Sequence, residues 1–127
     1  MTLHILVGQE AFYEEVQSAA RGGDGAEWIV PKKCVVGDEV LLFFRHRNAF
    51  VGCGTVLTAP TAAQFGRRAC YSSNVGRFRV FSRPVSLDAV LEKFPDWPWA
   101  TYPRSYTSQY PDGLLEFLES ASSRIGQ

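Results

Sequence analysis

The sequence predicts an α+β fold, a small and strongly bent β-sheet or pseudo-barrel of five or six strands with about three peripheral helices. Short apolar or alternating segments separated by turn residues recur along the chain, as in small barrels. Two glycines, Gly52 and Gly54, interrupt one of these segments. Glycine inside a strand marks a bulge, a bend, or the close approach of another backbone or a ligand, and a bend is the simplest of these in a small barrel.

The length and composition are those of one folded domain covering residues 1–127. The chain is 46% hydrophobic and 20% charged, which is typical of globular proteins. No apolar run is long enough to span a membrane, and MTLHILVGQEAF lacks the features of a signal peptide. The three cysteines are widely spaced without a CxxC pair, which suggests neither a disulfide framework nor a zinc site. We therefore expect a cytoplasmic protein with reduced thiols and no cofactor or metal.

The strands are expected where residues alternate or form short apolar runs. A buried central run, VLLFF (40–44), is expected to pair in a hairpin with AFVGCGTVL (49–57). The other predicted strands are TLHILV (2–7), AEWIV (26–30) and GRFRVFS (76–82), the last with arginines outward and its apolar face inward. Residues 58–72 show no periodicity and are predicted to be a long irregular connection, which is often functional.

Three segments have helical spacing. The first covers residues 9–20 and ends at the GGDG cluster, residues 22–25. The second begins with Ser86 as the N-cap and places its apolar residues, through Phe94, on one face. The third is expected to start at Pro111 and Asp112, with an apolar stripe made of Leu114, Leu118, Ala121 and Ile125.

The zero net charge hides an asymmetry along the chain. Residues 28–87 contain nine Lys and Arg against two acids, Asp38 and Glu39, so that this segment carries +7 and the flanks carry −7. A basic middle is what a polyanion-binding face would look like. The alternative is that these cations simply occupy the solvent faces of strands.

The segment WPWATYPRSYTSQYP (97–111) concentrates aromatic rings, prolines and hydroxyls around Arg104. Trp97 and Trp99 are two residues apart, so in an extended segment both rings face the same side. They could line the mouth of a pocket for a planar ligand, or at least one of them could pack against a neighbouring helix.

The order of these motifs resembles the PUA-like superfamily, and most closely the EVE domains, which are related to YTH domains. The resemblance covers roughly residues 2–120. It is carried by Gly37 and Asp38, the apolar run 40–44, the hairpin return 50–56, and PRSYT (103–107). The last of these is similar to a loop in EVE modules of modification-dependent restriction systems.

The resemblance implies a DNA- or RNA-binding reader that flips one modified base into an aromatic cage. In relatives, a tryptophan at a strand end forms one wall, which Trp28 matches, with Ile29 beside it, although core packing is the alternative for Trp28. The second wall comes from the loop before GRFRVFS, where this chain offers no tryptophan, only Phe65 and Tyr71, and Tyr71 is the better candidate. The residues implied to contact the base are Trp28, Ile29, Tyr71, Trp97, Trp99, Ser105, Tyr106 and Thr107. Those implied to contact phosphates are Arg67, Arg68, Arg77, Arg79 and Arg104.

Enzymatic functions have less support in the sequence. His4 and His46 are far apart, and no paired-carboxylate, metal-ligand or phosphate-loop pattern is present. We therefore expect a binding module for modified DNA, used in restriction, with any cleavage supplied by a nuclease partner or fused domain. A PUA-like module that binds structured or modified RNA is the alternative, because stacking walls and arginines serve both nucleic acids.

Overall fold

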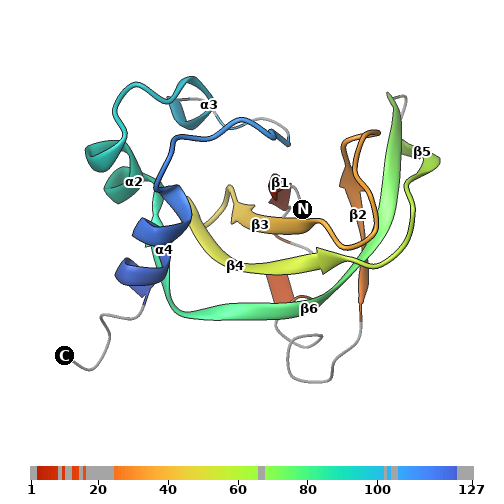
Figure 1. The fold of residues 1–127 in the computed structure, drawn as a ribbon, viewed down its shortest axis with the longest axis horizontal. Coiled ribbons are helices and arrows are strands. Elements are labelled where there is room, and N and C mark those ends of the chain that lie inside the picture. Colours follow the sequence, from red (N-terminus) through yellow and green to blue (C-terminus); the bar gives the residue numbers. More distant parts are fainter. Residues whose placement is uncertain are drawn as a thin grey trace.

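The computed structural model describes residues 3–8, 10, 13, 14, 16, 25–65, 68–101, 103 and 106–122, with only the backbone of Phe65 and Arg68. Its elements, in chain order, are β1 (Leu3–Gly8), β2 (Ala26–Val30), β3 (Glu39–Phe44), β4 (Ala49–Val56), β5 (Thr61–Phe65), β6 (Arg68–Ser86), α2 (Leu87–Lys93), α3 (Pro98–Thr101) and α4 (Leu114–Ser122). The strands form one curled half-barrel, with the three helices grouped beside one end of it (Figure 1). The predicted fold class is confirmed. None of the helices in these described ranges is long and apolar enough to cross a membrane.

The sheet has the order β1-β3-β4-β6-β2, and β5 pairs separately with β6. Strands β1 and β3 are parallel, whereas the other pairs are antiparallel. The long strand β6 makes the curl possible, because its first part pairs with β2 and β5 and its later part with β4. The sheet therefore curls strongly, with β1 and β2 as the two ends of its strand order.

The glycines of β4 allow this close crossing. A Cβ atom on Gly52 would clash with the carbonyl oxygen of Arg79, and one on Gly54 would lie 3.0 Å from that of Gly76. The register with β6 also shifts between Phe50 and Gly52 and between Cys53 and Thr55. The predicted bulge and bend are therefore present, and the atoms that approach the glycines are those of the neighbouring strand.

The alternation along β3 creates two separate cores, one on each face of the sheet. The barrel core consists of Leu6, Val16, Ala26, Trp28, Val30, Cys34, Val40, Leu42, Phe44, Val51, Val56, Val75 and Phe78. The helix-side core consists of Leu3, Ile5, Leu41, Phe43, Phe50, Val85, Leu87, Val90, Trp97, Ala100, Leu114 and Leu118. Both faces of β3 are therefore buried, as its uninterrupted apolar sequence predicts.

Several elements agree with the sequence analysis. The hairpin of β3 and β4 forms, and Ser86 caps α2 by accepting a hydrogen bond from the Ala89 amide at 3.1 Å. The helix predicted over residues 9–20 lies largely outside the described residues, although Tyr13, Glu14 and Val16 are helical and Val16 is buried.

Four predictions about local structure need correction. Residues 58–72 are not an irregular connection, since β5 and the start of β6 pair there as a hairpin. Their sequences, TAAQF and RACYS, do not alternate between apolar and polar residues, so they gave no strand signal. The WPW segment is not extended, since α3 begins at Pro98, a residue well suited to a first helical turn. Helix α4 begins at Leu114 rather than at Pro111, and Ile125 lies outside the described residues. The side chain of Val80 in β6 was expected to face inward, but it is 37% exposed, next to a shift in the register between β4 and β6.

Candidate functional site

The segment that follows α3 separates two candidate sites. It pairs with the free edge of β1, since Ile5 and Thr107 exchange backbone hydrogen bonds of 2.7 and 2.9 Å. Neighbouring side chains of an extended segment point in opposite directions. Accordingly, Ser108 points toward His4 inside the barrel, whereas Thr107 and Gln109 line a groove beside α3.

The groove lies between the end of α2, α3 and this segment, and it encloses about 500 Å³. We call it the tryptophan groove. Its lining residues are Lys93, Phe94, Pro95, Asp96, Trp97, Pro98, Trp99, Thr107, Gln109, Tyr110 and Pro111. Pockets of this size, with apolar walls and a few polar groups, are typical binding sites for small planar molecules.

Trp97 forms the rigid base of the groove. It is only 6% exposed, and its ring stacks on Phe50 with an interplanar angle of 11° and a centroid distance of 6.4 Å. Its indole Nε1–H donates a hydrogen bond to the Gln109 carbonyl oxygen at 3.2 Å, which ties α3 to the segment that forms the opposite wall. One face and the polar edge of this ring therefore make contacts that stabilise the fold.

The rings that a ligand can reach are Trp99 and Tyr110. Trp99 is half-buried and lies 5.0 Å from the Trp97 ring, measured between centroids, while Tyr110 is 38% exposed. Polar groups lie between them. The Thr107 hydroxyl accepts from the Gln109 amide at 3.1 Å, and the exposed Lys93 ammonium and Asp96 carboxylate stand at the rim. The described lining residues can thus offer stacking surface, hydrogen bonds and the positive charge of Lys93.

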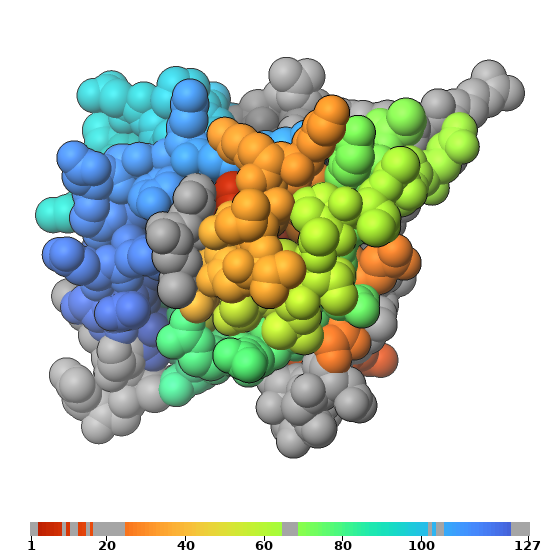
Figure 2. All heavy atoms as spheres, turned by 45° about the vertical axis from the view of Figure 1, so that its right-hand side comes forward, coloured from red at the N-terminus to blue at the C-terminus, as the bar shows by residue number. Residues whose placement is uncertain are grey.

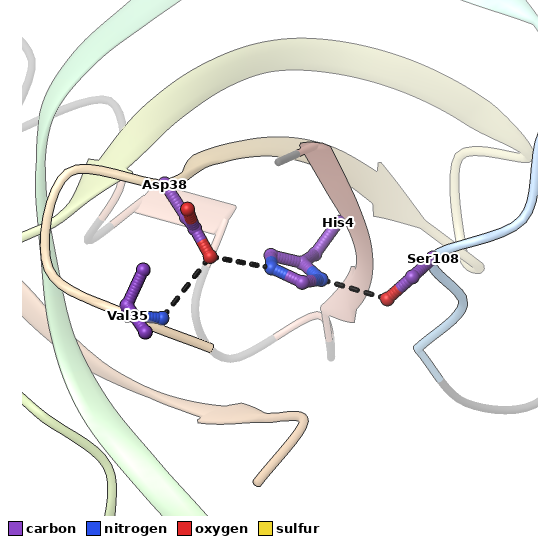
Figure 3. Close-up of polar contacts among 4 residues, drawn as sticks. All are labelled: His4, Val35, Asp38 and Ser108. Carbon is purple, nitrogen blue, oxygen red and sulfur yellow. Dashed lines mark hydrogen bonds and ion pairs between the residues drawn. The ribbon is translucent and has the colours of Figure 1, made fainter. Parts of the chain in front are cut away.

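The second site is a buried polar cluster around His4 (Figure 3). His4 is 1% exposed and Asp38 is 3% exposed. The His4 Nε2 atom lies 2.9 Å from Asp38 Oδ2, and its Nδ1 atom lies 2.7 Å from Ser108 Oγ. Because a carboxylate can only accept, a neutral ring donates from Nε2 to Asp38 and accepts at Nδ1 from the Ser108 hydroxyl. The Val35 amide donates to the same Asp38 oxygen at 3.0 Å.

Cys34 completes what we call the His4 cluster, made of His4, Cys34, Asp38 and Ser108. Burial, reinforced by the negative charge of Asp38, raises the pKa of the Cys34 thiol to about 11. The thiol is therefore protonated at neutral pH and is not an activated nucleophile in this state. The cluster carries no signal in the sequence, because its members come from residues 4, 34–38 and 108, which the parallel β1–β3 pairing and the Ile5–Thr107 bridge bring together.

Among the described residues, the ring of Trp28, which was implied to form the first wall of the aromatic cage, lies in the barrel core. Trp28 is 5% exposed and packs edge-on against Phe44 in the barrel core, with ring centroids 5.8 Å apart. Ile29 is 37% exposed on the opposite face of β2, so the two cannot line one wall. Tyr71 is half-buried, and the Lys32 ammonium lies 5.5 Å from its ring centroid. Trp28 thus contributes to the barrel core, and its contact with a base stays a prediction.

The turn between β2 and β3, which carries Lys32 and Lys33, is on the surface. Figure 2 shows residues of about 30–40 in orange, with the blue C-terminal region on one side and the yellow-green residues of β5 and β6 on the other.

Tyr106, another predicted base contact, is 39% exposed and is not among the residues that line the tryptophan groove.

The predicted phosphate contacts are only partly described. Arg77 and Arg79 are exposed on β6, away from the groove lining, and Arg79 forms an ion pair of 3.3 Å with Glu39. Arg67, Arg104 and the predicted base contact Ser105 lie outside the described residues, as does the side chain of Arg68. Of the predicted base contacts, the structure gathers Trp97, Trp99 and Thr107 around one groove.

Comparison with known proteins identifies the fold. No protein-family model and no curated protein matches the sequence. Solved structures do match over nearly the whole chain, at 11–13% identity for the three described next. Rpa0253 from Rhodopseudomonas palustris has a TM-score of 0.69 and 13% identity, covering 100% of this chain and 97% of its own. Atu2648 from Agrobacterium tumefaciens has a TM-score of 0.70 and 12% identity, with the same coverage. The ASCH protein from Zymomonas mobilis has a TM-score of 0.65 and 11% identity, covering 96% of this chain and 95% of its own. The chain therefore has the ASCH/PUA-like fold.

Proposed function

We propose that this protein is an EVE-type nucleic-acid-binding module that accepts one modified base in the tryptophan groove. The observation that supports this most is the groove itself, which has about 500 Å³ of space and is lined by Trp97, Trp99, Tyr110 and hydroxyl and amide groups. Modified DNA is the preferred ligand, in the setting of restriction. Cleavage would be supplied by a nuclease partner or a fused domain, and this chain would bind without catalysing a reaction.

Stacking provides the energy for this mode of binding. A base that leaves the duplex loses its stacking partners, and each aromatic contact in a protein restores about 1–3 kcal/mol. Tyr110 is 38% exposed and Trp99 is half-buried, so both can offer ring surface to a base. Trp97 is held by Phe50 and Gln109 and gives the groove a fixed base. A methyl or hydroxymethyl substituent adds apolar or hydrogen-bonding area that such a ring-lined groove can distinguish.

The charges near the groove suit a single nucleotide better than a long polyanion. Lys93 is the cation among the described lining residues, and Asp96 is three residues after it in the chain. We propose that Lys93 contacts the phosphate of the flipped nucleotide. Arg77 and Arg79 would contact phosphates farther along the strand, where contacts contribute affinity without base specificity.

Fluorescence anisotropy with one labelled duplex sequence tests the proposal. The duplex is prepared with unmodified, methylated or hydroxymethylated cytosine and adenine, together with a matched RNA. Preference for one modified duplex is the expected result. Tighter binding of RNA, dependent on its 2′-hydroxyl groups, would favour the RNA-binding alternative. Equal binding of all ligands would rule out a modified-base reader.

Two variants locate the base. Trp99→Ala and Tyr110→Ala should each weaken binding of the preferred duplex about 5- to 150-fold, the equivalent of about 1–3 kcal/mol of stacking. Tyr106→Ala is a matched control, because Tyr106 and Tyr110 are 39% and 38% exposed but only Tyr110 lines the groove. If Tyr106→Ala weakens binding and Tyr110→Ala does not, the base lies on the His4 side of the segment and the groove assignment is wrong.

A further inference from the structure

The His4 cluster has the composition and spacing of a metal site. His4, Cys34 and Asp38 each offer one donor atom, and these three atoms lie within 4.8 Å of one another. All three residues are buried, with exposures of 1%, 3% and 3%. Their donor atoms therefore converge on one small volume inside the barrel. We propose that His4, Cys34 and Asp38 bind one zinc ion.

The donor distances are close to those that zinc requires. Zinc bonds to sulfur at about 2.3 Å and to nitrogen or oxygen at about 2.0–2.2 Å. In a tetrahedral site these bond lengths place donor atoms about 3.3–3.8 Å apart. The His4 Nε2 and Asp38 Oδ2 atoms are 2.9 Å apart, and none of the three donor pairs exceeds 4.8 Å. Small side-chain adjustments are therefore sufficient to place an ion between them.

The surroundings hold these donors in place. Ser108 Oγ lies 2.7 Å from His4 Nδ1, the position usually occupied by the group that orients a metal-binding histidine. The Val35 amide orients the Asp38 carboxylate from the other side. The turn that carries Cys34 and Asp38 is fixed by backbone hydrogen bonds from Cys34 to Pro31, from Asp38 to Val35, and from Val56 to Asp38. A site built on such a turn and on a strand needs little reorganisation on binding.

Zinc is favoured over other common cations by the donor types. Thiolate and imidazole select zinc or another borderline metal, whereas magnesium and calcium require a full set of oxygen donors. Binding would replace the thiol proton of Cys34 by the metal and release that proton. The imidazole proton would move from Nε2 to Nδ1, from which it donates to Ser108. Three protein ligands leave the fourth position of a tetrahedral zinc ion for a water molecule.

Cobalt substitution tests the site through the thiolate. The chain has three cysteines, so Cys53→Ser combined with Cys70→Ser leaves Cys34 as its sole thiol and does not alter the proposed site. This variant, stripped of metal by a chelator, should bind one equivalent of Co²⁺ and develop a cobalt–thiolate charge-transfer absorption. Zn²⁺ should displace the cobalt and raise the Tm. Failure to develop that absorption, or a stoichiometry other than one, overturns the proposal.

Variants of the ligands complete the test. Cys34→Ser should abolish the charge-transfer absorption, while Cys53→Ser should keep it. If the absorption survives in Cys34→Ser, the metal binds elsewhere and the proposal is wrong. Should Cys34→Ser fail to fold, as judged by circular dichroism, the variant with Cys34 as its sole thiol still decides the question. Oligonucleotide binding is measured separately, so the zinc site and the base-binding groove can fail independently.

Discussion

The two cores of this protein differ in what they contain, although they share the strand β3. Among the described residues, the helix-side core is apolar, and the polar residue buried on α4, Ser122, bonds to the Glu119 carbonyl of its own helix. The barrel interior instead contains the His4–Asp38 pair. Buried polar groups cost stability unless they are satisfied, and the His4–Asp38 pair is a charged or ionisable pair of a kind that the described helix-side core does not contain. The helix-side core supports the tryptophan groove, and the barrel core surrounds the His4 cluster.

The largest expected effect comes from removing the ring under the groove. Phe50→Ala should lower the free energy of unfolding by about 3–5 kcal/mol, because Phe50 is fully buried and stacks on Trp97. It should also weaken oligonucleotide binding, since Trp97 loses its support. Urea unfolding and anisotropy measure the two effects.

Phe78→Ala, in the barrel core, provides the matched comparison. It should also destabilise the protein, because Phe78 is 7% exposed. Its effect on oligonucleotide binding, measured at a temperature where both variants are folded, should be small. An equal decrease in affinity in the two variants would contradict the assignment of different roles to the two cores.

A smaller effect is expected from the polar pair of the barrel. Asp38→Asn keeps the size of the side chain but removes the charge that accepts from His4 and Val35, so it should lower the free energy of unfolding by about 1–3 kcal/mol. The comparison variant is Asp96→Asn, an exposed acid at the groove, for which a change within about 0.5 kcal/mol is expected. Denaturant midpoints in the absence of metal provide the measurement. An unchanged midpoint for Asp38→Asn would show that the pair contributes no net stability.

The smallest effect is expected on the outer surface, which belongs to neither core. Arg77→Ala combined with Arg79→Ala should leave stability within about 0.5 kcal/mol, since both side chains are exposed. Binding of modified and unmodified duplexes should weaken alike. In a plot of the logarithm of affinity against the logarithm of salt concentration, the slope should become less steep by about 0.9 for each phosphate that the variant no longer neutralises. Weaker binding of the modified duplex alone would show that these arginines read the base.

The sequence predicted the groove residues better than their arrangement. Trp97, Trp99 and Thr107 were candidates because the segment from 97 to 111 concentrates rings and hydroxyls, and they do line one groove. Their separation from Trp28 was not predictable, because Trp28 is on β2 and its alternation places the ring inside the barrel against Phe44. Tyr110 was missed since a single exposed tyrosine carries no local signal of a pocket.

By itself, the sequence determined the number and type of most elements. The apolar run of β3, the hairpin with β4, the glycines at the crossing and the Ser86 cap are all local signals, and local signals act through backbone preferences and side-chain period. Only the tertiary structure decided which polar residues meet. His4, Cys34, Asp38 and Ser108 are brought together by a parallel strand pair and one edge bridge. Such contacts between distant residues depend on how the whole sheet closes, and no spacing along the chain records them.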